Sequence, residues 1–118
     1  MRHTVLALAT CVMALASSGE AAPATATSAA DLFNVCASLY DKGDMPGAAK
    51  ACNKAIVADP GNANAYFFKG SALYRSGRTV GGKFTVPSGT ADTLRRYLQL
   101  APKGRYAEDA RDMLKALQ

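Results

Sequence analysis

Leu32-Phe33-Asn34-Val35-Cys36-Ala37-Ser38-Leu39-Tyr40-Asp41-Lys42-Gly43 has a second copy further along the chain. The copy, Tyr66-Phe67-Phe68-Lys69-Gly70-Ser71-Ala72-Leu73-Tyr74-Arg75-Ser76-Gly77, begins 34 residues later. Phenylalanine, leucine, tyrosine and glycine recur at matching places in both, and each copy is followed by an alanine-rich or leucine-rich segment that ends in a proline, Pro60 or Pro102. A period of this length is typical of stacked-repeat proteins, whose usual product is a binding surface and not a catalytic centre.

Apolar spacing and end signals predict five helices, over residues 29–42, 45–58, 63–76, 89–100 and 105–117. Ser28, with Asp31 three residues on, forms a capping arrangement at the first helix. Gly43-Asp44 ends that helix and caps the second, whose first turn tolerates Pro46. The last helix is expected to expose its charged residues, as an end cap needs. The residues that it is expected to bury are Tyr106, Ala110, Met113, Leu114 and Leu117.

The segment 65–77 carries a recognisable motif. Tyr66 stands at an aromatic position, and Gly70 is a small residue where two helices can approach closely. In the first copy, Ala48, Ala55 and Pro60 follow the pattern of a partner helix. The combination resembles the tetratricopeptide repeat (TPR) family over roughly residues 29–102. The resemblance implies an all-α fold, with two antiparallel helix pairs and a C-terminal capping helix stacked into a right-handed α-solenoid.

The chain divides into an N-terminal targeting segment, a short leader and one domain. Residues 1–21, with a positive start and an apolar run over 5–16, are typical of a secretory signal peptide and predict export to the periplasm or the medium. Ala21 is the preferred cleavage site, although Ala16 and Ala22 stay open. Lipidation at Cys11 is the disfavoured alternative, because Thr10 is bulkier than the residue normally required. Residues 22–28 are expected to be a flexible leader.

The domain, residues 29–118, is expected to hold repeat one at 29–62, repeat two at 63–104 and the capping helix at 105–117. Repeat two is lengthened by 8 residues, because Pro60 and Pro102 are 42 residues apart where the period is 34. The extra residues fall at 78–88 and are expected to form an ordered loop with a β-like centre at 84–86. Such an insertion often lies at a binding edge, yet loop length costs little free energy, so a tolerated excursion is an equal alternative.

Aromatic residues seven apart predict the binding surface. Phe33 and Tyr40 in the first copy superpose on Phe67 and Tyr74 in the second. The family resemblance implies that this face of each first helix lines a concave groove for a peptide; the alternative is that some of these residues pack between adjacent helices. No carboxylate clamp is expected, because phenylalanines occupy the places that need polar groups. The full set of implied partner-binding residues is Phe33, Ala37, Tyr40, Asp41, Phe67, Ser71, Tyr74 and Arg75.

Positive charge is concentrated in the second repeat. The chain carries a net charge of +5, and residues 65–105 hold eight Lys and Arg against Asp92 alone. A basic stripe attracts acidic protein segments, anionic lipid or an acidic polymer at long range, although an ordinary solvated helix face is an equal alternative. The candidate patch consists of Arg78, Lys83, Arg95 and Arg96.

The resemblance also implies a disulfide. It places Cys36 on a first helix and Cys52 at an inward position of its antiparallel mate, and an exported protein meets an oxidising environment. A bond closing this loop stabilises by about 3 kcal/mol in the chain-entropy model. Two reduced cysteines, acting as small apolar groups, are the alternative.

Nothing in the sequence predicts catalysis. The only histidine is His3, inside the targeting segment, and no glycine or serine motif of a catalytic or phosphate site is present. We therefore expect no enzyme activity, no cofactor, no metal, no nucleic acid partner and no integral membrane span. The predicted function is that of an exported adaptor that binds a protein or peptide. The alternatives are an electrostatic anchor on an anionic envelope surface or acidic polymer, and self-association.

Overall fold

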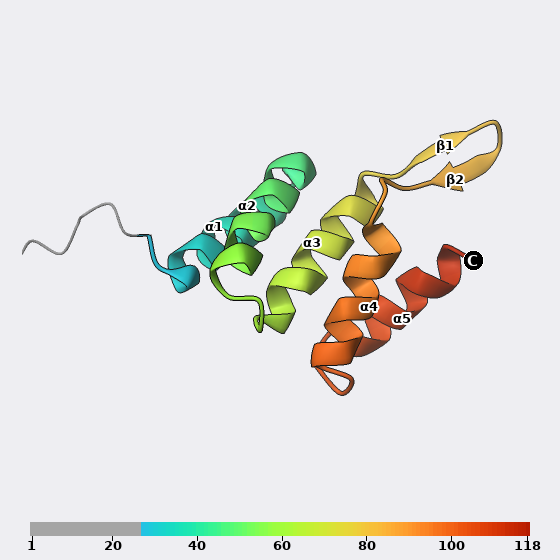
Figure 1. Ribbon diagram of the computed structural model, residues 1–118. Helices are drawn as coiled ribbons and strands as arrows, with labels where there is room; N and C mark the ends of the chain where they lie inside the picture. The colour runs from blue at the N-terminus through green and yellow to red at the C-terminus, as the bar shows by residue number, and fades with distance from the viewer. Residues whose placement is uncertain (1–26) are drawn as a thin grey trace, which may run out of the picture.

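The computed structural model describes residues 27–118, which form five helices and one hairpin (Figure 1). The predicted signal peptide and most of the predicted leader lie outside the described residues. The five helices confirm the all-helical prediction, apart from the hairpin, and each lies within two residues of its expected range. The elements are α1 (Ala29–Asp41), α2 (Met45–Ala58), α3 (Ala63–Arg75), β1 (Arg78–Val80), β2 (Lys83–Thr85), α4 (Thr90–Leu100) and α5 (Ala107–Ala116).

The first three helices begin at polar caps. Ser28 Oγ accepts a hydrogen bond from the Asp31 amide at 3.0 Å, as the sequence predicts. Asp44 and Asn62 accept equivalent bonds at the starts of α2 and α3. Gly43, at φ 84°, ends α1 in a left-handed conformation that glycine adopts without cost. Each cap satisfies backbone groups that a helix end leaves unpaired, so the chain can reverse within a few residues.

Each helix packs against the next one along the chain. In addition, α1 contacts α3, and α3 contacts α5, so the first members of successive helix pairs lie side by side (Figure 1). The α3–α4 pair packs closely at Gly70. A Cβ added at Gly70 would lie 2.7 Å from Leu94 Cδ2, well inside van der Waals contact. Gly70 therefore has the role that the sequence predicts for it, since any side chain would push the two helices apart.

The core has two parts. The larger lies between α3, α4 and α5 and contains Phe67, Leu94, Tyr97, Ala107 and Ala110. The smaller lies between α1 and α2, where Cys36 and Cys52 are joined by a disulfide with Cα atoms 4.8 Å apart. In α5 and its caps, Ala110 is buried as expected, whereas the other four residues are only half-buried, and the charged residues are exposed; the four are Tyr106, Met113, Leu114 and Leu117. The fold therefore consists of two small helical cores joined through α3.

The insertion forms a β-hairpin and not the loop that the sequence predicts. The strand centred on Phe84 begins one residue earlier than expected, and it pairs with β1, a strand that was not expected at all. Gly81 and Gly82, at φ 58° and 79°, form the two-residue turn between them. Such a turn requires left-handed backbone at both positions and matches the twist of the flanking strands. The hairpin projects away from the helices beyond the C-terminal end of α3 (Figure 1).

Candidate functional site

Phe67, a predicted groove residue, is buried in the core. Its side chain is 4% exposed and stacks on Tyr106 with ring centroids 4.3 Å apart and an interplanar angle of 5°. It also contacts Tyr97 at 5.4 Å. The chain just before α5 covers the face of α3 that the resemblance left open to a peptide. Phe67 therefore holds helices together and offers no surface to a partner.

Phe33 and Tyr40 join α1 to α3. Both rings pack against Phe68, with centroids 5.7 Å and 5.0 Å away. The Tyr40 hydroxyl lies 2.6 Å from the Ser71 Oγ and hydrogen-bonds to it, and Ser71 is fully buried. These contacts match the alternative in which the aromatic residues pack between adjacent helices. Phe68, which sequence analysis did not single out, is the residue on which they converge.

Some of the remaining predicted groove residues pack against other side chains, and others are exposed to solvent. Tyr74 packs edge-on against Phe84 of the hairpin at 5.4 Å. Arg75 is exposed and lies over the Tyr40 ring, 5.4 Å from its centroid. Asp41 is exposed, and Ala37 is half-buried. The structure thus brings the eight residues to neighbouring elements, but only Asp41 and Arg75 present largely free side chains.

The hairpin has two different faces. Phe84 lies opposite Thr79 in the register, and its ring packs so closely over Gly77 that a Cβ there would overlap it. Side chains alternate along a strand, so the neighbours of these residues point to the opposite face. That face carries the pairs Arg78–Thr85 and Val80–Lys83. Phe84 therefore fastens the hairpin to the end of α3 and leaves the other face free.

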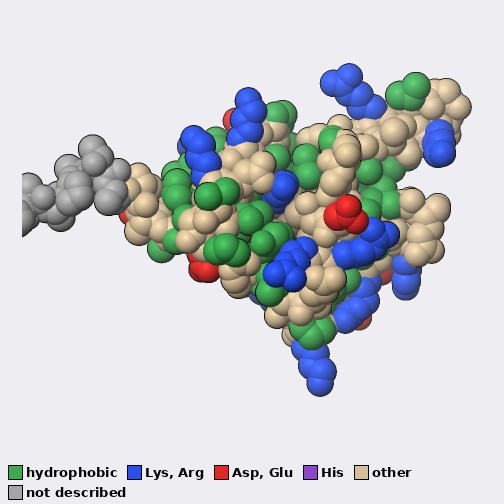
Figure 2. All heavy atoms as spheres, viewed as in Figure 1, with side chains coloured by type: hydrophobic (Ala, Val, Ile, Leu, Met, Phe, Trp, Pro, Cys, Tyr) green, Lys and Arg blue, Asp and Glu red, His purple; other side chains and the backbone are tan. Residues whose placement is uncertain are grey.

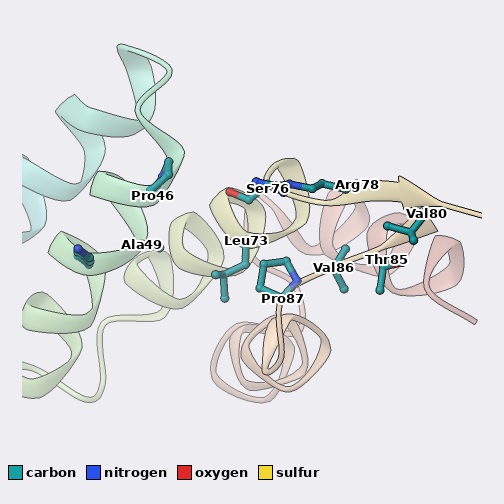
Figure 3. Close-up of a pocket in the computed structure, with 10 residues that line it drawn as sticks. Pro46, Ala49, Leu73, Ser76, Arg78, Val80, Thr85, Val86 and Pro87 are labelled. Carbon is teal, nitrogen blue, oxygen red and sulfur yellow. The ribbon is translucent and has the colours of Figure 1, made fainter. Parts of the chain in front are cut away.

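The free face of the hairpin forms one wall of a cleft of about 580 Å³ (Figure 3). The first turn and a half of α2 supplies the opposite wall, and the end of α3 supplies the floor. A cleft of this size lies within the range typical of ligand sites. The lining residues are Pro46, Ala49 and Lys50 of α2, Leu73 and Ser76 at the end of α3, Arg78, Val80 and Thr85 of the hairpin, and Val86 and Pro87 after it.

Most of the cleft lining is apolar, and its two charged groups are both basic. Lys50 and Arg78 stand on the two walls, and no aspartate or glutamate lines the cleft. Sequence analysis placed the 78–88 segment at a binding rim but did not identify the α2 wall. Its three residues have no motif of their own, and they lie about 30 positions before the hairpin. The one available signal was the inserted segment itself.

The four predicted patch residues are all exposed, but they lie on two elements. Arg78 and Lys83 are on the hairpin, and Arg95 and Arg96 are on α4. Arg95 forms an ion pair with Asp92 at 3.0 Å. Figure 2 shows Lys and Arg side chains spread over the hairpin and over α4, with few acidic groups among them. The second repeat therefore presents a scattered positive surface instead of one compact patch.

A second apolar surface lies on α1 and α2. Val35 is 51% exposed and Val57 is 83% exposed, and neither lines the hairpin cleft. Two smaller pockets of about 400 and 410 Å³ border these residues and share Leu32 and Lys54. Val35 and Val57 are therefore exposed valines outside the cleft, and they can be compared with Val80 and Val86, the valines that line it.

Clusters of metal-ligating side chains are absent from residues 27–118. No three His, Cys, Asp or Glu side chains there lie close enough to hold a metal ion. Every buried side-chain nitrogen or oxygen in the same region has a hydrogen-bond partner. Of the helices described, none has the length and apolar character to cross a bilayer. Comparison with protein-family models, with curated proteins and with solved structures finds no match to this chain.

Proposed function

We propose that the chain is an exported, TPR-type binding module that holds a segment of another protein in the hairpin cleft. The single observation that carries the proposal is the cleft itself, an apolar hollow of about 580 Å³ walled by the inserted hairpin and by α2. The 34-residue sequence repeat and the side-by-side packing of α1 with α3 and of α3 with α5 support the repeat assignment. Export rests on the composition of residues 1–21.

The lining of the cleft favours binding over chemistry. Its apolar members are aliphatic or proline side chains, and its polar members are two hydroxyls and two cations. Catalytic sites bring an acid, a base or a nucleophile into reach of one another. Ser76, the strongest nucleophile candidate, donates its hydroxyl to the Ala72 carbonyl at 2.8 Å. A lining of this composition is suited to burying an apolar side chain of a partner.

The cleft is a better receptor than the predicted groove. A binding hot spot needs an apolar hollow that becomes fully desolvated when it is filled. In the groove, Phe33 and Tyr40 already pack on Phe68, and Phe67 already stacks on Tyr106. In the cleft, by contrast, Val80 is 65% exposed and gains burial only when a partner arrives. The insertion at 78–88 thus belongs at a binding edge.

Electrostatic anchoring is the second candidate, and one observation favours it. Of the eight basic residues in 65–105, only Arg95 forms an ion pair with a described carboxylate. Unpaired cations on a surface attract anionic lipid or polymer, and that attraction is screened over about 8 Å at physiological salt. High salt should therefore abolish anchoring, whereas it should only weaken binding in the cleft, because the apolar contacts there are not screened.

The test compares two valine substitutions. We expect the oxidised, immobilised chain to retain a specific protein from an envelope extract, and Val86→Asp to lose it by placing a charge in the apolar cleft. Val57→Asp is the matched control, because Val57 is 83% exposed and lies outside the cleft. Retention is quantified by mass spectrometry, at low salt and at about 0.5 M salt.

The outcome separates the two functions. A protein that resists salt and is lost only from the Val86→Asp variant supports the cleft. Retention that vanishes at high salt and is unaffected by Val86→Asp supports the anchor. In that case, binding to vesicles containing phosphatidylglycerol should fall when Arg95 and Arg96 are both replaced by glutamate.

A further inference from the structure

We propose that the occupant of the cleft is an extended, acidic peptide segment with a branched aliphatic side chain as its anchor. This inference rests on the proposed function, since it names the class of segment that the same cleft accepts. Four features of the cleft carry it: the charge of its walls, the short aliphatic side chains of its interior, the absence of aromatic residues from its lining, and the unpaired strand edges beside it.

The walls of the cleft select for negative charge. Lys50 lines it from α2 and Arg78 lines it from β1, so that cationic groups stand on both sides of any bound segment. Lys83 projects from the same face of the hairpin as Arg78, two strand positions along on the partner strand. Asp44, at the start of α2, accepts a hydrogen bond from the Gly47 amide and does not line the cleft. A segment with carboxylates on either side of its anchor complements this arrangement.

The interior of the cleft selects for an aliphatic anchor. Leu73 forms the floor, and Ala49, Val80 and Val86 stand around it. Figure 3 shows Pro46 and Ala49 on α2, across from Leu73 and Pro87. These short side chains leave a hollow that a leucine, isoleucine or valine fills with little loss of rotamer freedom. A charged anchor placed among these four side chains would lose its water and would gain no hydrogen bond from them.

The surroundings of the cleft favour an extended backbone. Polyproline segments dock on grooves lined by aromatic rings, and no aromatic side chain lines this cleft. A two-stranded sheet is the whole of the β-structure in the part of the chain described, so neither strand pairs on its outer side. An extended segment can add to such an edge and satisfy its own backbone groups while its alternate side chains enter the cleft.

Selection from a random heptapeptide phage library tests the inference directly. The oxidised full chain is immobilised, and peptides are kept only if they bind the chain and fail to bind the Val86→Asp variant. We expect the kept peptides to be enriched in aspartate and glutamate on both sides of a leucine, isoleucine or valine. Their affinities are then measured by fluorescence anisotropy at about 0.15 M salt.

A charge reversal provides the second measurement. Lys50→Glu with Arg78→Glu should weaken the selected acidic peptides by about tenfold or more and should favour synthetic versions that carry lysine in place of each carboxylate. Lys54→Glu with Lys103→Glu is the matched control, because it changes the net charge equally at exposed positions outside the cleft. The control should change affinity by less than about threefold.

Each result bears on a different claim. Kept peptides that are neutral or basic overturn the acidic inference and leave the binding function intact. Acidic peptides that lose equal affinity in both charge variants show non-specific attraction and also overturn it. If no peptide depends on Val86, the cleft is not a peptide receptor, and the proposed function fails together with the inference.

Discussion

Replacement of Gly70 by alanine is expected to destabilise the protein, although alanine is the better helix former. Alanine in a helix interior is favoured over glycine by about 1 kcal/mol. Against this gain, the new Cβ would lie 2.7 Å from Leu94 Cδ2 and 2.9 Å from Leu94 Cγ. Leu94 is fully buried and cannot swing away, so α3 and α4 must separate. Overpacking of this kind costs about 1–3 kcal/mol, which leaves a net loss of up to about 2 kcal/mol.

Gly70→Ala should stabilise the protein instead of destabilising it when the Leu94 side chain is truncated. Leu94→Ala alone costs about 2–5 kcal/mol, because it leaves a cavity in the larger core. In that background the Cβ of Gly70→Ala enters empty space, so the substitution should stabilise by about 1 kcal/mol. The coupling between the two positions is therefore expected to be about 1–3 kcal/mol and favourable to the double variant.

Urea unfolding followed by far-UV circular dichroism measures this cycle, with an osmolyte present if Leu94→Ala is too unstable without it. Gly70→Ala is compared in the native and Leu94→Ala backgrounds under identical conditions. Equal effects in both backgrounds would refute the close approach of α3 and α4, and with it the helix pairing of the second repeat.

Two further substitutions test the ends of the fold. Replacement of Cys36 and Cys52 by alanine should lower the free energy of unfolding by about 3 kcal/mol, because their disulfide closes a loop with a sequence separation of 16; a native chain whose urea midpoint does not respond to reductant would contradict this. Tyr97→Phe should cost about 1–3 kcal/mol, because the buried Tyr97 hydroxyl accepts a hydrogen bond from the Tyr106 amide at 2.9 Å. An unchanged thermal midpoint for Tyr97→Phe would show that water replaces this bond.

The helices were predictable because their signals are local. Ser28, Asp44 and Asn62 are good caps, and apolar spacing marks the buried side of each helix. The resemblance to the TPR family implied the role of Gly70 and favoured a bond between Cys36 and Cys52 over two reduced cysteines, since each concerns a helix and its immediate neighbour. Each of these features involves residues of one helix or of two helices that follow one another in the sequence.

The final positions of the aromatic side chains could not be predicted in this way. Phe67 repeats the position of Phe33, yet Phe67 stacks on Tyr106 and Phe33 packs on Phe68. Sequence periodicity shows which residues share a helix face, but it does not show what covers that face. In this chain the covering residue, Tyr106, lies about 40 positions after Phe67 and just before α5, outside the repeated pattern.

The hairpin was partly predictable. A two-residue hairpin turn favours a Gly-Gly pair between two strand-forming segments. The sequence has this combination in Gly81-Gly82, which lies between Thr79-Val80 and Lys83-Phe84. The sequence analysis expected a β-like centre at 84–86 but not its partner strand, although this signal was available. The cleft could not be predicted in this way, because it depends on the packing of Phe84 over Gly77, which leaves the opposite face of the hairpin across the cleft from α2. Such a site emerges only from the packing of distant elements.

Methyl NMR of the valines tests the central claim most directly, because the described residues place two valines in the cleft and two outside it. Val80 and Val86 line the cleft, whereas Val35 and Val57 are exposed on α1 and α2. Titration with an acidic peptide from the library should shift the methyl signals of Val80 and Val86 and leave those of Val35 and Val57 in place. Shifts confined to Val35 and Val57, or spread equally over all four, would contradict the assignment of the cleft as the binding site.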